Sequence, residues 1–327
     1  MFSPGNVSQA KKGRDGKVGA GREFRLGYIR GPGIMALVLD VAQENDFFKT
    51  EGVRVRLVRC TMEELDEGLA SGSLDMVRRG PDADMVNSLA RGGTIKVVAA
   101  VANRPVGELV THPNYRSLTD LRGKSLAVIH PRLGSTAFLR HLLWQSGVNS
   151  RDYTLDTAGG TPQRYVALTS GRVAGAMLSP PEAWQAKQDG FRVLASLPIC
   201  YPAAISTSFQ VDCATAERRR GVVVGFLRAL VRAHRWVYSP ENNQAVLAGL
   251  QRLGYTRQQA HKDYAFFIGS RVLASDCAVS KAAMEQMVDL LTDIGELRRP
   301  APNPGYFVDS SFLEDAVAEL PAKCVTV

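Results

Sequence analysis

Short β-type segments alternate with longer amphipathic segments along most of this chain. Residues 24–29 and 53–58 alternate apolar with polar side chains, as strands do, and residues 34–45 between them form an apolar helical segment. The break at Gly31-Pro32-Gly33 separates the first strand from that helix. A strand–helix alternation of this kind is typical of a largely parallel sheet covered by helices. The sequence therefore predicts an α/β protein.

The alternation continues in two successive units. The expected elements of the first are a helix at 61–70 that opens with a capping box, a strand at 72–77, a helix at 81–91 and a strand at 95–101. Those of the second are strands at 125–129, 153–155, 173–178 and 192–195 with helices at 136–145, 162–169 and 181–188. Beyond residue 211 the pattern becomes helical, with amphipathic segments at 222–237 and 284–297. A chain of 327 residues exceeds one usual core, which favours two lobes.

Charge and composition exclude several classes of protein. The formal net charge is +8, and much of the excess lies in the first 25 residues and in the run Arg218-Arg219-Arg220. No nucleic-acid-binding signature accompanies it, so we expect no nucleic acid partner. No segment approaches the ~20 apolar residues of a membrane span. Residues 1–22 have the composition of a disordered basic tail. They lack a signal peptide, which predicts a cytoplasmic protein as written, or a periplasmic one if the start is misassigned.

Metal and cofactor sites are not indicated. The five histidines have no HExxH spacing, and the five cysteines form no CxxC pair. The wide, irregular spacing of the cysteines favours free thiols over a disulfide framework. No phosphate-binding GxxxxGK motif is present. We therefore expect neither a metal nor a cofactor.

Five segments together resemble one family. They are ENDFFKTEGV at 44–53, SGSLDM at 71–76, GGTIKVVA at 92–99, SLTDLRGK at 117–124 and LTSGRVAGA at 168–176. Their order resembles the SsuA/THI5-like (NMT1) family, which comprises sulfonate- and nitrate-type solute-binding proteins of ABC transporters and cytosolic THI5-like pyrimidine synthases. The resemblance covers about residues 24–320.

The resemblance implies a two-lobed type II periplasmic-binding-protein-like fold with a ligand cleft between the lobes. The expected first lobe comprises residues 23–105 and 203–327, including the C-terminal helices, and the second comprises residues 106–202. The crossovers are expected near 103–105 and 198–202, where prolines make stiff hinge segments.

Ligands of open α/β sheets bind beyond the carboxyl ends of strands, so the loops at those ends supply the candidate site. Forked arginine donors and glycine-rich backbone suit a carboxylate or sulfonate. The candidates are Arg30 and Gly31 in the first loop, Arg78, Arg79 and Gly80 in the second, Arg132, Ser135 and Thr136 in the third, Gln163, Ser179 and Glu182 in later loops, and Tyr201 at the second crossover. Adjacent strand residues face opposite ways, so one of Arg78 and Arg79 should enter the cleft.

Two functions fit these residues. The first is a solute-binding protein that closes on a small organic anion, with an ABC permease as partner in uptake. The alternative is a cytosolic enzyme on the same fold, either a decarboxylase, a desulfinase-like enzyme or a THI5-like biosynthetic enzyme acting on a small acid, aromatic acids included. The cysteine-rich run of THI5-like synthases is reduced here to Cys200, and the first loop holds no cysteine nucleophile. Binding is therefore favoured over catalysis.

Overall fold

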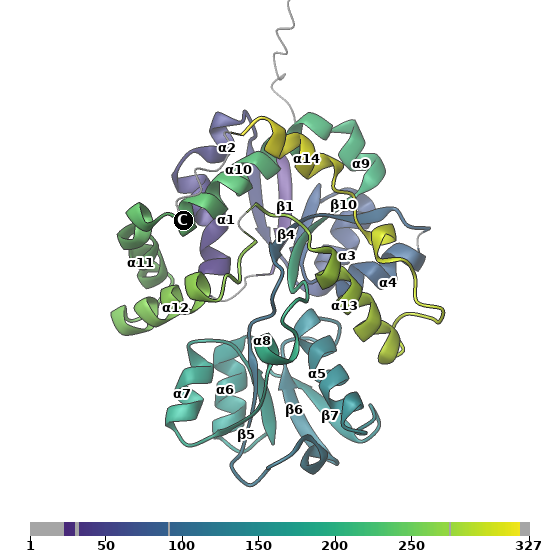
Figure 1. The fold of residues 1–327 in the computed structure, drawn as a ribbon, viewed down its shortest axis with the longest axis vertical. Coiled ribbons are helices and arrows are strands. Elements are labelled where there is room, and N and C mark those ends of the chain that lie inside the picture. The colour runs from purple at the N-terminus through teal and green to yellow at the C-terminus, as the bar shows by residue number, and fades with distance from the viewer. Residues whose placement is uncertain (1–22, 30–32, 91, 275, 321–327) are drawn as a thin grey trace, which may run out of the picture.

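The computed structural model describes residues 23–29, 33–90, 92–274 and 276–320, and in this part of the chain two lobes each hold a five-stranded sheet (Figure 1). The first sheet has the order β2-β1-β3-β10-β4 and the second the order β7-β6-β8-β5-β9. The strands of the first are β1 (Phe24–Tyr28), β2 (Val55–Arg59), β3 (Met76–Arg79), β4 (Ile95–Ala102) and β10 (Thr207–Asp212). Those of the second are β5 (Glu108–Thr111), β6 (Lys124–Val128), β7 (Tyr153–Thr157), β8 (Gly175–Leu178) and β9 (Arg192–Ser196).

Both sheets follow the same plan. Strands β1, β2 and β3 pair in parallel, as do β6, β7 and β8. One strand in each sheet then runs antiparallel to both of its neighbours, β10 in the first lobe and β5 in the second. The prediction of a two-lobed α/β fold is confirmed. The expected basic tail at 1–22 lies outside the described residues.

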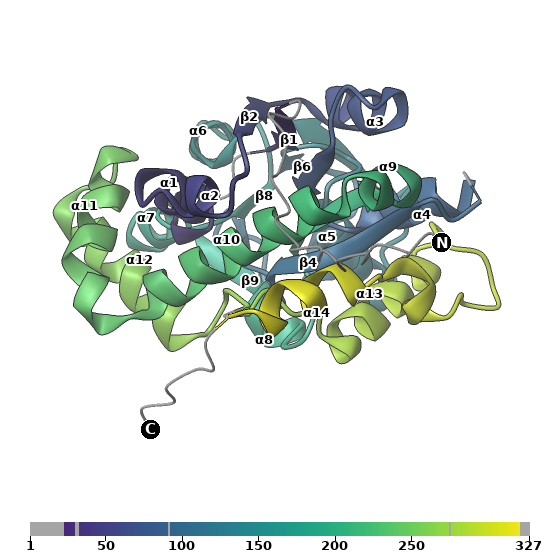
Figure 2. The same cartoon turned by 90° about the horizontal axis from the view of Figure 1, so that it is seen from above.

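Helices cover both sheets (Figure 2). In the first lobe they are α1 (Ile34–Glu44), α2 (Phe47–Thr50), α3 (Met62–Ser71), α4 (Asp82–Ala90), α9 (Cys213–Arg218), α10 (Arg220–Tyr238), α11 (Asn243–Arg252), α12 (Arg257–Gly269), α13 (Lys281–Asp293) and α14 (Ser311–Ala318). In the second lobe they are α5 (Gly134–Gln145), α6 (Thr161–Thr169) and α7 (Glu182–Gln188), and α8 (Leu197–Cys200) lies at a crossover. No helix in the described ranges is both long and apolar enough to span a membrane.

The core of the first lobe forms around α10, whose apolar stripe is buried against the sheet and α1. Phe226 lies at its centre, with its ring 5.0 Å from Phe24 of β1, 5.2 Å from Phe48 of α2 and 5.7 Å from Phe209 of β10, centroid to centroid. Aromatic side chains from three elements therefore fix α10 across the face of the sheet. This packing holds the sheet in place, and the C-terminal ends of β1 and β3 lie on the side that faces the second lobe.

The chain passes between the lobes twice, from β4 to β5 through residues 103–107 and from β9 to β10 through α8 and residues 201–206. The C-terminal segment also contacts the second lobe. Met284 and Met287 of α13 belong to the same buried cluster as Phe138 of α5, and Arg140 of α5 forms an ion pair with Glu296. Helix α13, which is assigned here to the first lobe, therefore also packs against the second lobe.

Candidate functional site

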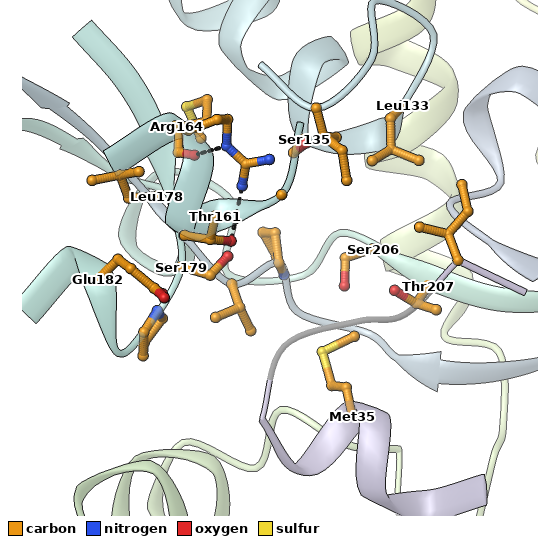
Figure 3. Close-up of a pocket in the computed structure, with 18 of the residues that line it drawn as sticks. Met35, Leu133, Ser135, Thr161, Arg164, Leu178, Ser179, Glu182, Ser206 and Thr207 are labelled. Carbon is orange, nitrogen blue, oxygen red and sulfur yellow. Dashed lines mark hydrogen bonds between the residues drawn. The ribbon is translucent and has the colours of Figure 1, made fainter. Parts of the chain in front are cut away.

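A cavity of about 590 Å³ lies between the lobes and is lined by both (Figure 3). The first lobe contributes the C-terminal ends of β1, β2 and β3, the start of α1, and residues around the start of α12. The second lobe contributes the end of β8 and the starts of α5, α6 and α7. The carboxyl ends of parallel strands meet here, which is where open α/β sheets bind ligands.

Arg78 supplies buried positive charge at the wall of this cavity. It lies on β3, a strand buried along its whole length, and its side chain is only 1% exposed. Nη2 donates to the carbonyl oxygen of Met35 at 2.5 Å, whereas Nε and Nη1 have no hydrogen-bond partner among the described residues. Burial lowers the pKa of Arg78 to about 10, which still leaves it charged at neutral pH. A buried cation with unused donors is costly unless an acceptor reaches it, so this position suits an anion.

Arg79 and Gly80 continue the same wall. Arg79 faces the other side of the sheet, and its Nη2 pairs with Asp66 Oδ1 of α3 at 2.8 Å. Burial lowers the pKa of Arg79, and the charge of Asp66 acts in the opposite direction. A Cβ atom on Gly80 would lie 2.8 Å from Asp82 Oδ1 and 3.4 Å from the Cα of Gly134 in the other lobe. A larger residue here would have to displace the Asp82 carboxylate.

Arg164 of α6 lies at the opposite wall, and the sequence analysis did not select it. Its Nε donates to the Met177 carbonyl at 2.6 Å and its Nη2 to Thr161 Oγ1 at 3.0 Å (Figure 3). Its Nη1 donates to the Gly159 carbonyl at 2.8 Å. Burial lowers its pKa to about 10. The sequence held one usable signal, because Arg164 precedes the buried Ala167 and Leu168 by three and four residues and so falls on the inner face of α6.

Glu182 and several hydroxyl groups complete the polar lining. Burial raises the pKa of Glu182, while its own backbone N–H and the charge of Arg164 lower it. Ser135 of α5 and Ser179 after β8 line the second lobe's side, and Ser206 and Thr207 line the side of the crossover and β10 (Figure 3). Apolar side chains separate these groups: Ile29, Met35, Val106, Ile129, Leu133, Phe138, Met177, Leu178, Leu197 and Leu253.

Arg30 and Gly31 of the first loop lie outside the described residues. Where the chain resumes, Asp263 of α12 covers the start of α1, and its Oδ2 accepts a hydrogen bond from the Ile34 N–H at 3.3 Å. The hydroxyl of Tyr255 accepts one from the Gly33 N–H at 3.0 Å. Burial raises the pKa of Asp263 to about 7. The positive end of α1 is thus already occupied by a carboxyl group of the protein, a contact the sequence could not indicate across 229 residues.

Seven of the sequence-predicted residues come together at the cavity, namely Arg78, Arg79, Gly80, Ser135, Gln163, Ser179 and Glu182. That one of the two adjacent arginines enters the cavity stays a prediction: both residues belong to the lining, and the Arg79 side chain pairs with Asp66 of α3.

Arg132, Thr136 and Tyr201 lie away from the cavity lining. Arg132 pairs with Asp66 and Glu63 of α3. The Thr136 hydroxyl donates to the His130 carbonyl at 2.7 Å. The Tyr201 hydroxyl lies 2.8 Å from His141 Nδ1, and its ring packs on Phe138. Each of these side chains has an ion-pair or hydrogen-bond partner outside the lining.

Metal ligands and reactive thiols do not gather at the site. No group of three His, Cys, Asp or Glu side chains in the described ranges could hold a metal ion. The four described cysteines are all free, and none lines the cavity: Cys60, Cys200, Cys213 and Cys277.

Solved structures share this architecture. A protein from Bordetella bronchiseptica RB50 matches with a TM-score of 0.75 and 16% identity, over 90% of this chain and 97% of that one. The nitrate-binding protein NrtA from Synechocystis PCC 6803 matches with a TM-score of 0.71 and 13% identity, over 91% and 89%. The alkanesulfonate-binding protein SsuA from Xanthomonas axonopodis pv. citri, bound to MOPS, matches with a TM-score of 0.68 and 18% identity, over 87% and 97%. A comparison with curated proteins gives no match.

Two lobes, two crossovers and a cavity between them define a protein of the periplasmic-binding fold. A family model described as NMT1/THI5 like matches residues 36–243, which is more than half of the chain. The chain belongs to the NMT1/THI5-like family, as its sequence motifs indicate.

Proposed function

We propose that this protein is the solute-binding component of an ABC-type uptake system and that it closes on a small organic anion. Arg78 carries the proposal, because its guanidinium is fully buried at the cavity wall with Nε and Nη1 unused by the described residues. An anionic group bound beside Arg78 would offset this buried charge. The structurally similar proteins named for sulfonate and nitrate binding support the same class of ligand.

The size and lining of the cavity favour an organic ligand over a bare inorganic ion. At ~30 Å³ per water molecule, 590 Å³ is room for roughly 20 waters, and cavities of about 300–1,000 Å³ typically hold small organic molecules. Apolar side chains such as Met35, Phe138 and Met177 form much of the wall. We therefore infer a ligand with one anionic group and an apolar body.

Both lobes take part in the proposed binding. Arg78, Arg79 and Gly80 approach the ligand from the first lobe, and Ser135, Gln163, Ser179 and Glu182 approach it from the second. Arg164 stabilises the second wall and adds positive potential there. A ligand that contacts both walls stabilises the closed arrangement by its differential affinity for it.

The enzymatic alternative is not favoured. Neither a cysteine nor a histidine is among the described residues that line the cavity. Covalent attack on a sulfinate would need a nucleophile of that kind, and the single Cys200 retained from the THI5-like run is exposed and outside the lining.

A ligand panel with the thermal melting temperature as readout tests the proposal. Carboxylates, sulfonates and phosphonates with apolar bodies should raise the melting temperature with increasing concentration by mass action, and the effect should disappear in Arg78→Met. Arg218→Met is the matched control, because Arg218 is exposed and donates only to Thr215. Stabilisation by amines or sugars, with none by anions, would refute the proposal.

An ABC permease is the partner that this function implies. The genes beside this one give a direct check, since a neighbouring ATPase and permease support uptake, whereas neighbouring ring-cleaving or tailoring enzymes support catalysis. Uptake also implies that the protein acts outside the cytoplasmic membrane, which amino-terminal sequencing of the native protein would test.

A further inference from the structure

Glu182 is the one acidic side chain among the described residues that line the cavity. It begins α7 on the second lobe's wall and is partly buried. Within the described part of the chain its side chain forms no ion pair with an arginine, lysine or histidine. Apart from the hydrogen bond from its own backbone N–H, this carboxylate is available to accept hydrogen bonds from a ligand.

The charge of Arg164 favours the ionised form of Glu182, whereas burial, the larger effect, raises its pKa. The Arg164 nitrogens donate to the Met177 and Gly159 carbonyls and to Thr161, none of which carries negative charge. Glu182 is thus the acidic group that offsets this buried arginine, and a ligand ammonium group bound to Glu182 would compete for that role.

The anion-binding donors lie at the other side of the cavity. Arg78 donates to the carbonyl of Met35, and Figure 3 shows Met35 across the cavity from Glu182, with Ser206 and Thr207 on the Met35 side. The apolar side chains of Leu133, Phe138 and Met177 also line the cavity. The lining therefore has Arg78 at one end, apolar walls, and at the other end the acceptor Glu182 beside Arg164.

We propose that the ligand is an organic anion whose apolar body carries a neutral hydrogen-bond donor, a hydroxyl or an N–H group, and that Glu182 accepts this hydrogen bond. The inference rests on the proposed function, because it takes the anionic group to be bound at Arg78. A neutral donor adds a hydrogen bond to Glu182 and leaves its charge to offset Arg164, whereas a methyl group offers no hydrogen bond. Glu182 is then the residue that determines specificity among organic anions.

Three probes with the same anion and ring test this specificity: 4-hydroxybenzenesulfonate, p-toluenesulfonate and 4-(aminomethyl)benzenesulfonate. Isothermal titration calorimetry should show the hydroxyl compound binding about ten- to a hundredfold more tightly than the methyl compound, the range expected for a hydrogen bond to a charged group. The ammonium compound should bind at least tenfold more weakly than the hydroxyl compound.

Glu182→Gln keeps the size of the side chain and removes its charge, so the preference for hydroxyl over methyl should fall at least fivefold. Glu241→Gln, an exposed residue of the 3-10 helix at Pro240–Asn242, should leave the preference unchanged. If the melting curve shows that Glu182→Gln does not fold, the relative affinities of the three probes for the unaltered protein test the inference by themselves.

Equal binding of the hydroxyl and methyl probes, tightest binding of the ammonium probe, or an undiminished preference in Glu182→Gln would each overturn this inference. If none of the three probes binds although other anions of the panel do, the inference fails and the proposed function stands. If no anion binds in either experiment, both fail.

Discussion

Arg132 of the second lobe and Asp66 of the first join the two lobes, with Nη1 of Arg132 2.8 Å from Oδ2 of Asp66. Asp66 also binds Arg79, which lines the cavity, with its Oδ1 2.8 Å from Nη2. Glu63, one turn earlier on α3, pairs with Arg132 at 3.5 Å and with His130 Nε2 at 3.2 Å. Two carboxylates of the first lobe therefore hold the loop before α5 of the second, and one of them reaches a cavity residue.

Arg132→Gln should weaken ligand binding by destabilising this closed arrangement. Arg132 is about half exposed (46%), and such ion pairs contribute ~0–1 kcal/mol, so the expected loss of affinity is about two- to fivefold. The loss should appear mainly as faster dissociation in stopped-flow measurements and should shrink at high salt. Arg151→Gln, an exposed arginine in the same lobe, is the control. An unchanged dissociation rate at low salt would contradict a role for this contact in closure.

Arg78→Met should abolish anion binding while leaving the free energy of unfolding unchanged or higher. The substitution removes a buried guanidinium with two unused nitrogen donors and one hydrogen bond to Met35, and replaces them with an apolar side chain. Replacing buried charge with apolar volume is often neutral or stabilising. Urea unfolding and calorimetric titration of the same sample measure both effects. A variant that is strongly destabilised would show that Arg78 is needed for the fold instead.

The sequence was sufficient to predict the strand–helix alternation, because most of the parallel strands and their helices carry clear periodicity. It did not reveal β5 and β10. β5 is a four-residue segment, Glu108–Thr111, that follows Pro105 and Gly107. β10 does alternate polar with apolar residues from Ser208 to Val211, but this six-residue segment stands alone before the helical C-terminal region. Both strands run antiparallel to their neighbours, so the pattern of parallel units gave no reason to expect them.

The sequence predicts a site residue when its position along the chain determines where its side chain lies. It does not predict one when contacts with distant segments determine this. Arg78, Ser179 and Glu182 line the cavity because they lie at or just after strand ends. Arg132 follows a strand as well, but two carboxylates on the other lobe hold its side chain. Arg164 and Asp263 are positioned by packing across elements, which periodicity within one segment does not report.

All five cysteines should be free thiols. The four described cysteines form no disulfide, and Cys277 is fully buried, which raises the pKa of its thiol well above the usual range. Thiol titration under denaturing conditions, on protein purified without reductant, should therefore find five free thiols. Three or fewer would indicate a disulfide and hence an oxidising compartment.

Asp263→Asn should remove a pH dependence of stability. Burial raises the pKa of Asp263 to about 7, above the ~3.9 of an unfolded aspartate. The stabilisation from the bound proton is fully present below pH ~4 and is lost as the pH rises to about 7, at up to ~1.4 kcal/mol per pH unit. Asparagine can still accept the hydrogen bond from the Ile34 N–H. The free energy of unfolding of the variant, measured in urea, should therefore lack this decline between pH 4.5 and 7.5. The exposed Asp289→Asn should keep the decline, and a wild-type slope in Asp263→Asn would contradict the assignment.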